Sequence, residues 1–221
     1  MLEVKNLSKS FGGVHAMQDV SFSVRAGSVH SVIGPNGAGK TTLFNLISGV
    51  YEPTRGEILL DGENVMLGAH LHTRSSLLGG MTGATRRADA ALREEALRLI
   101  DYVGVGRHAH AHATQLSFGL LKRLEIARAL ASRPRLLLLD EPAAGLNDTE
   151  THEITELIRS IAASGVTVLL VEHDMKLVMN ISDHLLVLDY GRKLAEGTAA
   201  EVRANPQVIA AYLGTEAEAS A

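Results

Sequence analysis

The chain contains no cysteine and no tryptophan among its 221 residues, and only 5 prolines. Without cysteine it has no disulfide, thiolate zinc site, iron–sulfur cluster or cysteine nucleophile, and this composition fits a reducing compartment. The low proline content and the 21% of charged residues argue against a disordered or collagen-like chain. The chemistry of this chain therefore depends on other side chains.

Long apolar runs and a strong charge of either sign are also missing. The longest apolar stretches, 136–139 and 166–171, are far shorter than the ~20 residues needed to span a bilayer. Residues 1–7 lack the basic and apolar segments of a secretory signal. The net charge of −4 gives no indication of a nucleic-acid partner. We therefore expect a cytoplasmic chain that does not bind nucleic acid and reaches a membrane only through a partner.

Short apolar runs alternate with helical patterns, and this predicts an α/β fold. With 46% apolar residues, the chain is large enough for one substantial domain. A strand is predicted at 29–33, and strands buried on both faces of a mostly parallel sheet are predicted at 135–139, 166–171 and 184–188. Helices are predicted at 43–47, 87–103, 120–132, 148–163 and 175–181. The strands predicted at 2–7 and 20–24 would form an antiparallel β patch, and 73–85 is predicted as a loop.

A glycine-rich segment directly after the 29–33 strand carries the strongest chemical signal. Residues 34–41 match G-x-x-x-x-G-K-[ST] in full and open a helix. Its backbone N–H groups can surround phosphate oxygens at a helix N-terminus. Lys40 would place a positive charge at the β- and γ-phosphates, and the Thr41 hydroxyl is a ligand for Mg²⁺. The predicted nucleotide-binding residues here are Gly34, Pro35, Asn36, Gly37, Ala38, Gly39, Lys40, Thr41 and Thr42.

Two adjacent carboxylates, Asp140 and Glu141, follow a run of four leucines. The carboxyl end of a strand is where open α/β sheets bind ligands. Asp140 is suited to hold Mg²⁺ through its water shell, and Glu141 is suited to orient or deprotonate an attacking water. Taken alone, either carboxylate could be an acidic helix cap, but beside a phosphate loop the catalytic interpretation is stronger.

The segment Leu116-Ser117-Phe118-Gly119-Leu120 precedes the predicted 120–132 helix. Ser117 is a natural N-cap, and Gly119 allows a close backbone approach. This is a weak signal by itself, but Ser117 stands 23 residues before Asp140.

With these elements at this spacing, the chain resembles the ATP-binding subunits of ABC transporters over nearly its whole length. The resemblance implies that Ser117 and Gly119 of one subunit cap the γ-phosphate held by another, so that two subunits, identical or paralogous, enclose two ATP molecules. It also implies that Phe11 stacks on adenine and that residues 143–147 touch the partner. His173 would be the switch histidine, acting in catalysis with Lys40 and Glu141. A core aromatic and a structural histidine are the alternatives for Phe11 and His173.

Within that family the chain is most similar to the subunits of branched-chain amino acid importers of the Liv type. Residues 141–147, 171–179 and 195–214 carry this narrower resemblance. It implies ATP and Mg²⁺ as cofactors, integral membrane permease subunits as partners and, indirectly, a periplasmic or extracellular solute-binding protein. It also implies a peripheral place at the cytoplasmic face of the inner membrane for a subunit that is soluble when isolated. The cargo would be branched-chain amino acids or similar small solutes.

The chain departs from the family between the phosphate loop and Ser117. These elements lie 77 residues apart, fewer than the family usually carries, and none of the three glutamines, Gln18, Gln115 and Gln207, stands in the middle of the interval. The family has there a glutamine-bearing loop that touches Mg²⁺ and docks the membrane subunit. We therefore expect one domain over 1–221 that is shortened near 62–64, with a helical signature subdomain at about 64–132 and a tail at 206–221.

More than one function is compatible with this sequence. The leading interpretation is an ATP hydrolase that powers an importer. The alternatives are a nucleotide-binding subunit whose hydrolysis or coupling is impaired by the missing loop, and an ATPase of another transport system. A P-loop kinase or GTPase would share residues 34–41 but has no use for Ser117 or His173.

Overall fold

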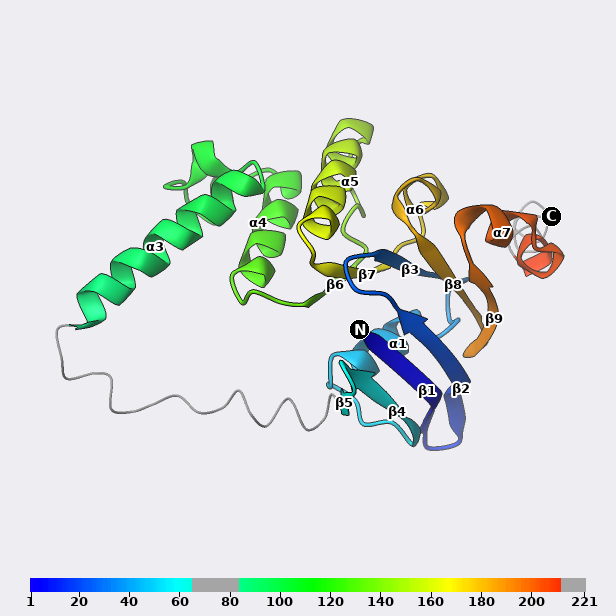
Figure 1. Cartoon of the computed structure of the whole chain (residues 1–221). Helices are drawn as coiled ribbons and strands as arrows, with labels where there is room; N and C mark the ends of the chain where they lie inside the picture. Colours follow the sequence, from blue (N-terminus) through cyan, green and yellow to red (C-terminus); the bar gives the residue numbers. More distant parts are fainter. Residues whose placement is uncertain (65–83, 212–221) are drawn as a thin grey trace.

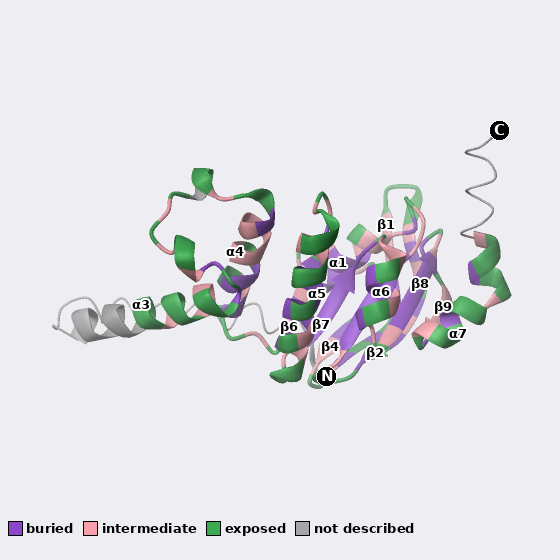
Figure 2. Ribbon diagram, turned by 90° about the horizontal axis from the view of Figure 1, so that it is seen from above, coloured by how far each residue is buried: buried purple, intermediate pink, exposed green. Residues whose placement is uncertain are grey.

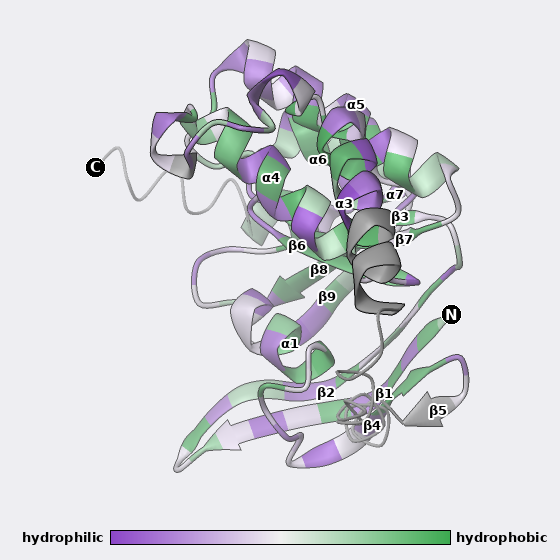
Figure 3. Ribbon diagram, turned by 90° about the vertical axis from the view of Figure 1, so that its left-hand side faces the viewer, coloured by the Kyte–Doolittle hydropathy of each residue, from purple (hydrophilic) through white to green (hydrophobic). Residues whose placement is uncertain are grey.

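Two β-sheets lie one below the other, with helix α1 (Lys40–Ile47) packed between them (Figures 1 and 3). The computed structural model describes residues 1–64 and 84–211. The larger sheet has the order β6-β7-β3-β8-β9, and the smaller has the order β2-β1-β4-β5. The predicted α/β class, with a mostly parallel core sheet and an antiparallel β patch, is confirmed.

The larger sheet forms the centre of the molecule. Its strands are β3 (Val29–Ile33), β6 (Leu136–Asp140), β7 (Thr167–Val171), β8 (His184–Asp189) and β9 (Arg192–Gly197). The first four are parallel, and β9 runs antiparallel along β8. Every residue of β3 and β7 is buried, as in strands covered on both faces, and in β3 these include the polar residues His30 and Ser31 (Figure 2). The parallel strands bring their carboxyl ends to one edge of the sheet, where ligands bind in such folds.

The smaller sheet is antiparallel and covers one face of α1. Its strands are β1 (Leu2–Phe11), β2 (Val14–Val24), β4 (Arg55–Leu60) and β5 (Glu63–Asn64). A tight turn at Gly12 and Gly13 joins β1 to β2. Alternate residues of these strands pack on Leu43 and Phe44 of α1, which fixes the helix against both sheets.

Helices cover the opposite face of the central sheet. They are α4 (Phe118–Leu130), α5 (Asp148–Ala163), α6 (Met175–Ile181) and α7 (Ala199–Ala204). The short 3₁₀ segments η2 (Gly106–His108) and η3 (Ala113–Gln115) precede α4. The core on this face combines Ile154 and Ile158 of α5 with Leu137 of β6 and Val168 of β7. None of the described helices is long and apolar enough to cross a membrane.

Helix α3 (Ala84–Tyr102) extends away from the sheets and meets α4 only towards its C-terminal end (Figures 1 and 2). The sequence places Ala88, Leu92, Ala96, Leu99 and Val103 along one face of this helix. Of these, Leu92 and Ala96 are exposed, Leu99 is half-buried and Val103 is buried. The apolar face is thus covered only where α4 lies beside it. The loop predicted at 73–85 falls outside the described residues, apart from the first two residues of α3.

Candidate functional site

The loop between β3 and α1 requires glycine at two positions because neighbouring strands press against it. Gly39 has φ 99°, in the left-handed region, and a Cβ there would lie 2.9 Å from the carbonyl oxygen of Ala16. A Cβ at Gly34 would lie 2.3 Å from the carbonyl oxygen of Leu188. Cβ atoms do not approach backbone oxygens this closely, so larger residues would push the loop away from β2 and β8. The glycines of the motif therefore fix where the phosphate loop sits.

Lys40 begins α1 and turns back over the loop. Its Nζ atom donates hydrogen bonds to the carbonyl oxygens of Gly34, at 2.7 Å, and Pro35, at 3.0 Å. Burial lowers the pKa of the Lys40 amine, and the nearby charges of Glu141 and Asp140 oppose that shift. The amine is thus a partly desolvated cation that faces the acidic pair.

The two carboxylates come where β6 ends. Asp140 is the last residue of the strand, and Glu141 turns the chain sharply with φ 46°, a left-handed conformation that is uncommon outside glycine. The Glu141 N–H donates to the carbonyl oxygen of Val171, 2.9 Å away, which ties this turn to β7. Burial and the charge of Glu141 raise the pKa of Asp140, and Lys40 and Lys122 oppose that shift.

His173 lies directly across from Glu141. Its Nδ1 atom is 3.6 Å from the Oε1 atom of Glu141. Both side chains are about half-exposed, so each is accessible from solvent. The predicted switch histidine and the predicted catalytic carboxylate are therefore brought together by the fold.

A cavity of about 550 Å³ opens beside these groups. Phosphate-loop residues and Glu141 line one side of it. The lining residues from the loop are Asn36, Gly37, Gly39, Lys40, Thr41 and Thr42. Asp140 does not line this cavity. It lines a smaller cavity of about 160 Å³, together with Lys122. The fold therefore brings Lys40, Thr41 and Glu141 to one cavity with Asp140 just behind it.

The cavity is also lined by residues that the sequence did not indicate. Val14, His15 and Ala16 of β2 line it, together with Tyr190, an 83% exposed residue in the turn between β8 and β9. Phe11 is not among the lining residues. It pairs with Val14 across the hairpin, and its ring packs edge-to-face on Tyr51 with centroids 5.2 Å apart.

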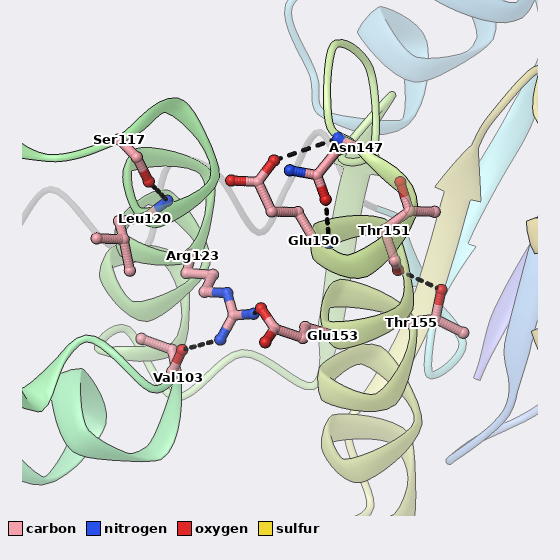
Figure 4. Close-up of polar contacts among 9 residues, drawn as sticks. All are labelled: Val103, Ser117, Leu120, Arg123, Asn147, Glu150, Thr151, Glu153 and Thr155. Carbon is pink, nitrogen blue, oxygen red and sulfur yellow. Dashed lines mark hydrogen bonds and ion pairs between the residues drawn. The ribbon is translucent and has the colours of Figure 1, made fainter.

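The Ser117–Gly119 segment begins α4 and lies against α5 instead of the cavity (Figure 4). The Ser117 hydroxyl accepts the N–H of Leu120 at 3.3 Å, so Ser117 is the predicted N-cap. Gly119 leaves room for the Glu150 carboxylate, because a Cβ at this position would lie 2.6 Å from its Oε1 atom. One turn further along α4, the Arg123 guanidinium forms an ion pair with Glu153 of α5. This chain alone does not bring Ser117 to its own phosphate loop.

Sequence reasoning also missed Glu172, which is only 1% exposed. Its Oε1 atom accepts the N–H of Ala143 at 2.9 Å, and its Oε2 atom accepts the N–H of His173 at 3.1 Å. A glutamate beside a histidine has no sequence signal that distinguishes it from an exposed charge.

Comparisons with known proteins agree with this geometry. The family model described as "ABC transporter" matches residues 17–144, and the model "Branched-chain amino acid ATP-binding cassette transporter" matches residues 192–218. The chain is 42% identical to BraF of Pseudomonas aeruginosa, a high-affinity branched-chain amino acid transport ATP-binding protein, over 97% of this chain and 98% of BraF. It is 39% identical to LivG of Escherichia coli strain K12, which has the same description, with the same coverage. Both alignments extend over 249 positions, more than the 221 residues of this chain, so these relatives carry residues that this chain lacks.

Solved structures show the same fold. The crystal structure of MJ1267, an ATP-binding cassette of an ABC transporter in its ADP conformation, superposes with a TM-score of 0.82 at 27% identity. The match covers 97% of this chain and 98% of MJ1267. The ATP-binding cassette MJ0796, a dimer bound to ADP and Pi in a post-hydrolysis state, gives a TM-score of 0.71 at 25% identity, over 90% of this chain and 99% of MJ0796.

Proposed function

Because the chain belongs to the ATP-binding subunits of ABC transporters, we propose that it binds and hydrolyses ATP to power an importer of branched-chain amino acids. One observation carries the proposal. Lys40, Glu141 and His173 follow three different parallel strands and converge at the same edge of the central sheet. This arrangement supplies a cation for phosphate oxygens, a carboxylate for the attacking water and an imidazole beside that carboxylate.

The phosphates of ATP would bind to the loop at 34–42. Its backbone N–H groups and the N-terminus of α1 attract negative charge, and Lys40 adds a full positive charge. Because the Lys40 amine is already partly desolvated, its attraction to phosphate oxygens is stronger than that of an exposed lysine. We propose that these groups stabilise the charge that develops on the γ-phosphate, and that Phe11, beside Val14 of the cavity wall, stacks on adenine.

Glu141 would act on the attacking water. Its half-exposed carboxylate lines the cavity and lies beside His173, so a water held between Glu141 and the γ-phosphate would have a base in contact with it. His173 would contact the γ-phosphate and thereby report whether ATP is bound.

The oxygen donors present fit a magnesium ion. Thr41 offers a hydroxyl and Asp140 a carboxylate, and Mg²⁺ is commonly held by one or two such groups together with substrate phosphates. We propose that these two residues hold it. When bound, the ion supplies positive charge that neutralises the phosphates.

A second subunit would complete the site. Ser117 and Gly119 do not line the cavity of their own chain, and MJ0796 forms a dimer in its nucleotide-bound structure. We propose that residues of about 64–132 form a shortened helical subdomain that presents Ser117 and Gly119 to the phosphates held by a partner ATPase subunit. Permease subunits would hold this pair at the cytoplasmic face of the inner membrane and receive cargo from a solute-binding protein outside.

Uptake of labelled leucine tests the proposal in the source organism. Replacing the chromosomal copy with the Glu141→Gln variant should abolish leucine, isoleucine and valine uptake. The variant subunit is still made, but it no longer hydrolyses the ATP that drives transport. Uptake of methionine, a solute outside the proposed cargo, is the control and should be unchanged in the variant strain. Unchanged leucine uptake in a strain that contains only the variant would contradict the proposed cargo.

A further inference from the structure

We propose that Glu172 is a positioning residue that sets the relation between Glu141 and His173. This inference rests on the proposed ATP hydrolysis for its kinetic consequence but not for its geometry. Glu172 is the first residue of the loop after β7, and its buried carboxylate reaches the loop after β6; both loops carry residues proposed to act on the γ-phosphate.

Each oxygen of this carboxylate has its own backbone partner. Oε1 accepts from Ala143 in the loop after Glu141, and Oε2 accepts from His173 in the loop before α6. A buried ionised group is costly unless hydrogen bonds compensate it, and these two bonds to backbone N–H groups do so. The bond to Ala143 joins segments that lie 29 residues apart in the sequence, whereas the bond to His173 stays within the loop that carries Glu172.

The first bond supports a turn that is strained. Glu141 holds φ 46°, a conformation that persists in a residue other than glycine only when its surroundings enforce it. Three hydrogen bonds do so here. Glu141 N–H donates to the Val171 carbonyl at 2.9 Å, Ala144 N–H donates to the Glu141 carbonyl at 3.2 Å, and Ala143 N–H donates to Glu172. Loss of the third would let the Glu141 side chain leave its place at the cavity.

The second bond fixes the histidine loop. The Nδ1 atom of His173 lies 3.9 Å from the Oε2 atom of Glu172 and 3.6 Å from the Oε1 atom of Glu141. The imidazole therefore lies between two carboxylates, one buried and one at the cavity. None of the described hydrogen bonds joins Glu172 to the phosphate loop. We therefore expect Glu172 to act through Glu141 and His173 only.

The chemistry of the side chain explains why a carboxylate is needed. Glutamine has the same shape but only one acceptor oxygen, and its amide N–H₂ would face a backbone N–H. Glu172→Gln therefore leaves one buried donor unpaired and releases one of the two loops. We expect kcat for ATP hydrolysis to fall by about 100-fold, the cost of a misplacement of about 1 Å in a catalytic group. The Kd for ATP should stay within about twofold, because the Lys40 loop is untouched.

A matched control is Asp183→Asn. Asp183 also accepts a backbone N–H, that of Val29 at 2.8 Å, but at the opposite end of the parallel strands. It should leave kcat unchanged. A third variant, Glu172→Gln combined with Glu141→Gln, should hydrolyse no more slowly than Glu141→Gln alone, because the two residues act as a unit.

Hydrogen exchange of the Ala143 and His173 amides gives a readout that does not depend on activity. Both amides should exchange faster in Glu172→Gln than in the parent, and neither should change in Asp183→Asn. The inference is overturned if kcat stays at the parental value, if Kd rises in step with the fall of kcat, or if these amides keep their protection. Failure of the parent itself to hydrolyse ATP would contradict the proposed function. The exchange rates would still show whether Glu172 holds the Ala143 and His173 amides.

Discussion

The Nδ1 atom of His173 lies 3.6 Å from the Oε1 atom of Glu141, although the two residues follow different strands. The register of the sheet explains this proximity. β6 and β7 are adjacent and parallel, and Asp140 pairs with Val171, so the residues that follow each strand emerge side by side. The contact is therefore a consequence of strand pairing, and it places a carboxylate and an imidazole side by side at this edge of the sheet.

Removing the Lys40 amine should weaken nucleotide binding. Lys40→Ala deletes a charged donor that would contact phosphate oxygens, and such a contact is worth roughly 1.5–3 kcal/mol, or about 10- to 150-fold in Kd. Titration with a fluorescent ATP analogue measures the change. The matched control is Lys5→Ala, which removes a lysine of β1 that pairs with Glu3 and Glu57. This variant should bind the ATP analogue like the parent. Equal affinity of Lys40→Ala and the parent would remove Lys40 from the site.

Blocking the N-terminus of α4 should prevent assembly without preventing nucleotide binding. Ser117→Arg places a bulky cation where the partner's phosphate loop is proposed to dock. Sizing chromatography with and without ATP should show an ATP-dependent dimer for the parent and a monomer for the variant. Ser132→Arg makes the same change just beyond the other end of α4 and should still dimerise. A dimer that responds to neither ATP nor Ser117→Arg would rule out the proposed arrangement.

Acid should destabilise the fold through His30, which is buried in β3. Burial, together with the neighbouring His184, lowers the pKa of His30 to about 4 from its ordinary value near 6.5. The unfolded chain therefore binds more protons between these two pH values, and stability is lost as pH falls through this window. The loss from His30 approaches roughly 3 kcal/mol near pH 4.

Urea unfolding at pH 7 and pH 4.5 measures this effect. His30→Leu should lose about 2–3 kcal/mol less than the parent between these pH values, because it has no group to protonate. His112→Leu, in an exposed loop, is the control and should lose as much as the parent. The same acid sensitivity in His30→Leu would assign the effect to other groups.

Arg123 and Glu153 should contribute unequally to stability, although they form one ion pair (Figure 4). The Arg123 side chain is mostly buried and also donates to the Val103 carbonyl at 3.4 Å, whereas the Glu153 side chain is about half-exposed. Arg123→Ala should lower the free energy of unfolding by about 1–3 kcal/mol, and Glu153→Ala by under about 1 kcal/mol. Urea unfolding compares them, with Lys5→Ala and Glu57→Ala as an exposed control pair. Equal costs would mean that the ion pair alone matters.

The parts of the fold that depend on local patterns could be predicted from the sequence. Three of the buried strands, β6, β7 and β8, could be found because four consecutive apolar residues suit a parallel sheet, and the phosphate loop because its spacing is fixed by backbone geometry. Strand β9 was missed because Arg192 and Lys193 interrupt any apolar pattern. Helix α7 was missed although Thr198 and Glu201 form a capping box, a signal that could have found it.

The remaining parts of the site depend on contacts between distant segments. Glu172 is buried because it meets Ala143, and no local pattern encodes that meeting. The packing of the Phe11 ring on Tyr51 likewise joins segments that are far apart in the sequence. Leu92 is exposed because α4 lies only beside the C-terminal end of α3, and the periodicity of α3 does not indicate this.

The most direct test of the proposed ATP hydrolysis is phosphate release by the purified chain. It is measured against subunit concentration for the parent and for Glu141→Gln. The parent should release phosphate with a specific activity that rises with subunit concentration, because two chains complete each site. Glu141→Gln should bind ATP with parental affinity, release less than about one hundredth as much phosphate and accumulate as an ATP-bound dimer, whereas Glu156→Gln on the outer face of α5 should match the parent. Equal turnover by Glu141→Gln and the parent, or a parent that releases no phosphate at any concentration, would contradict the account.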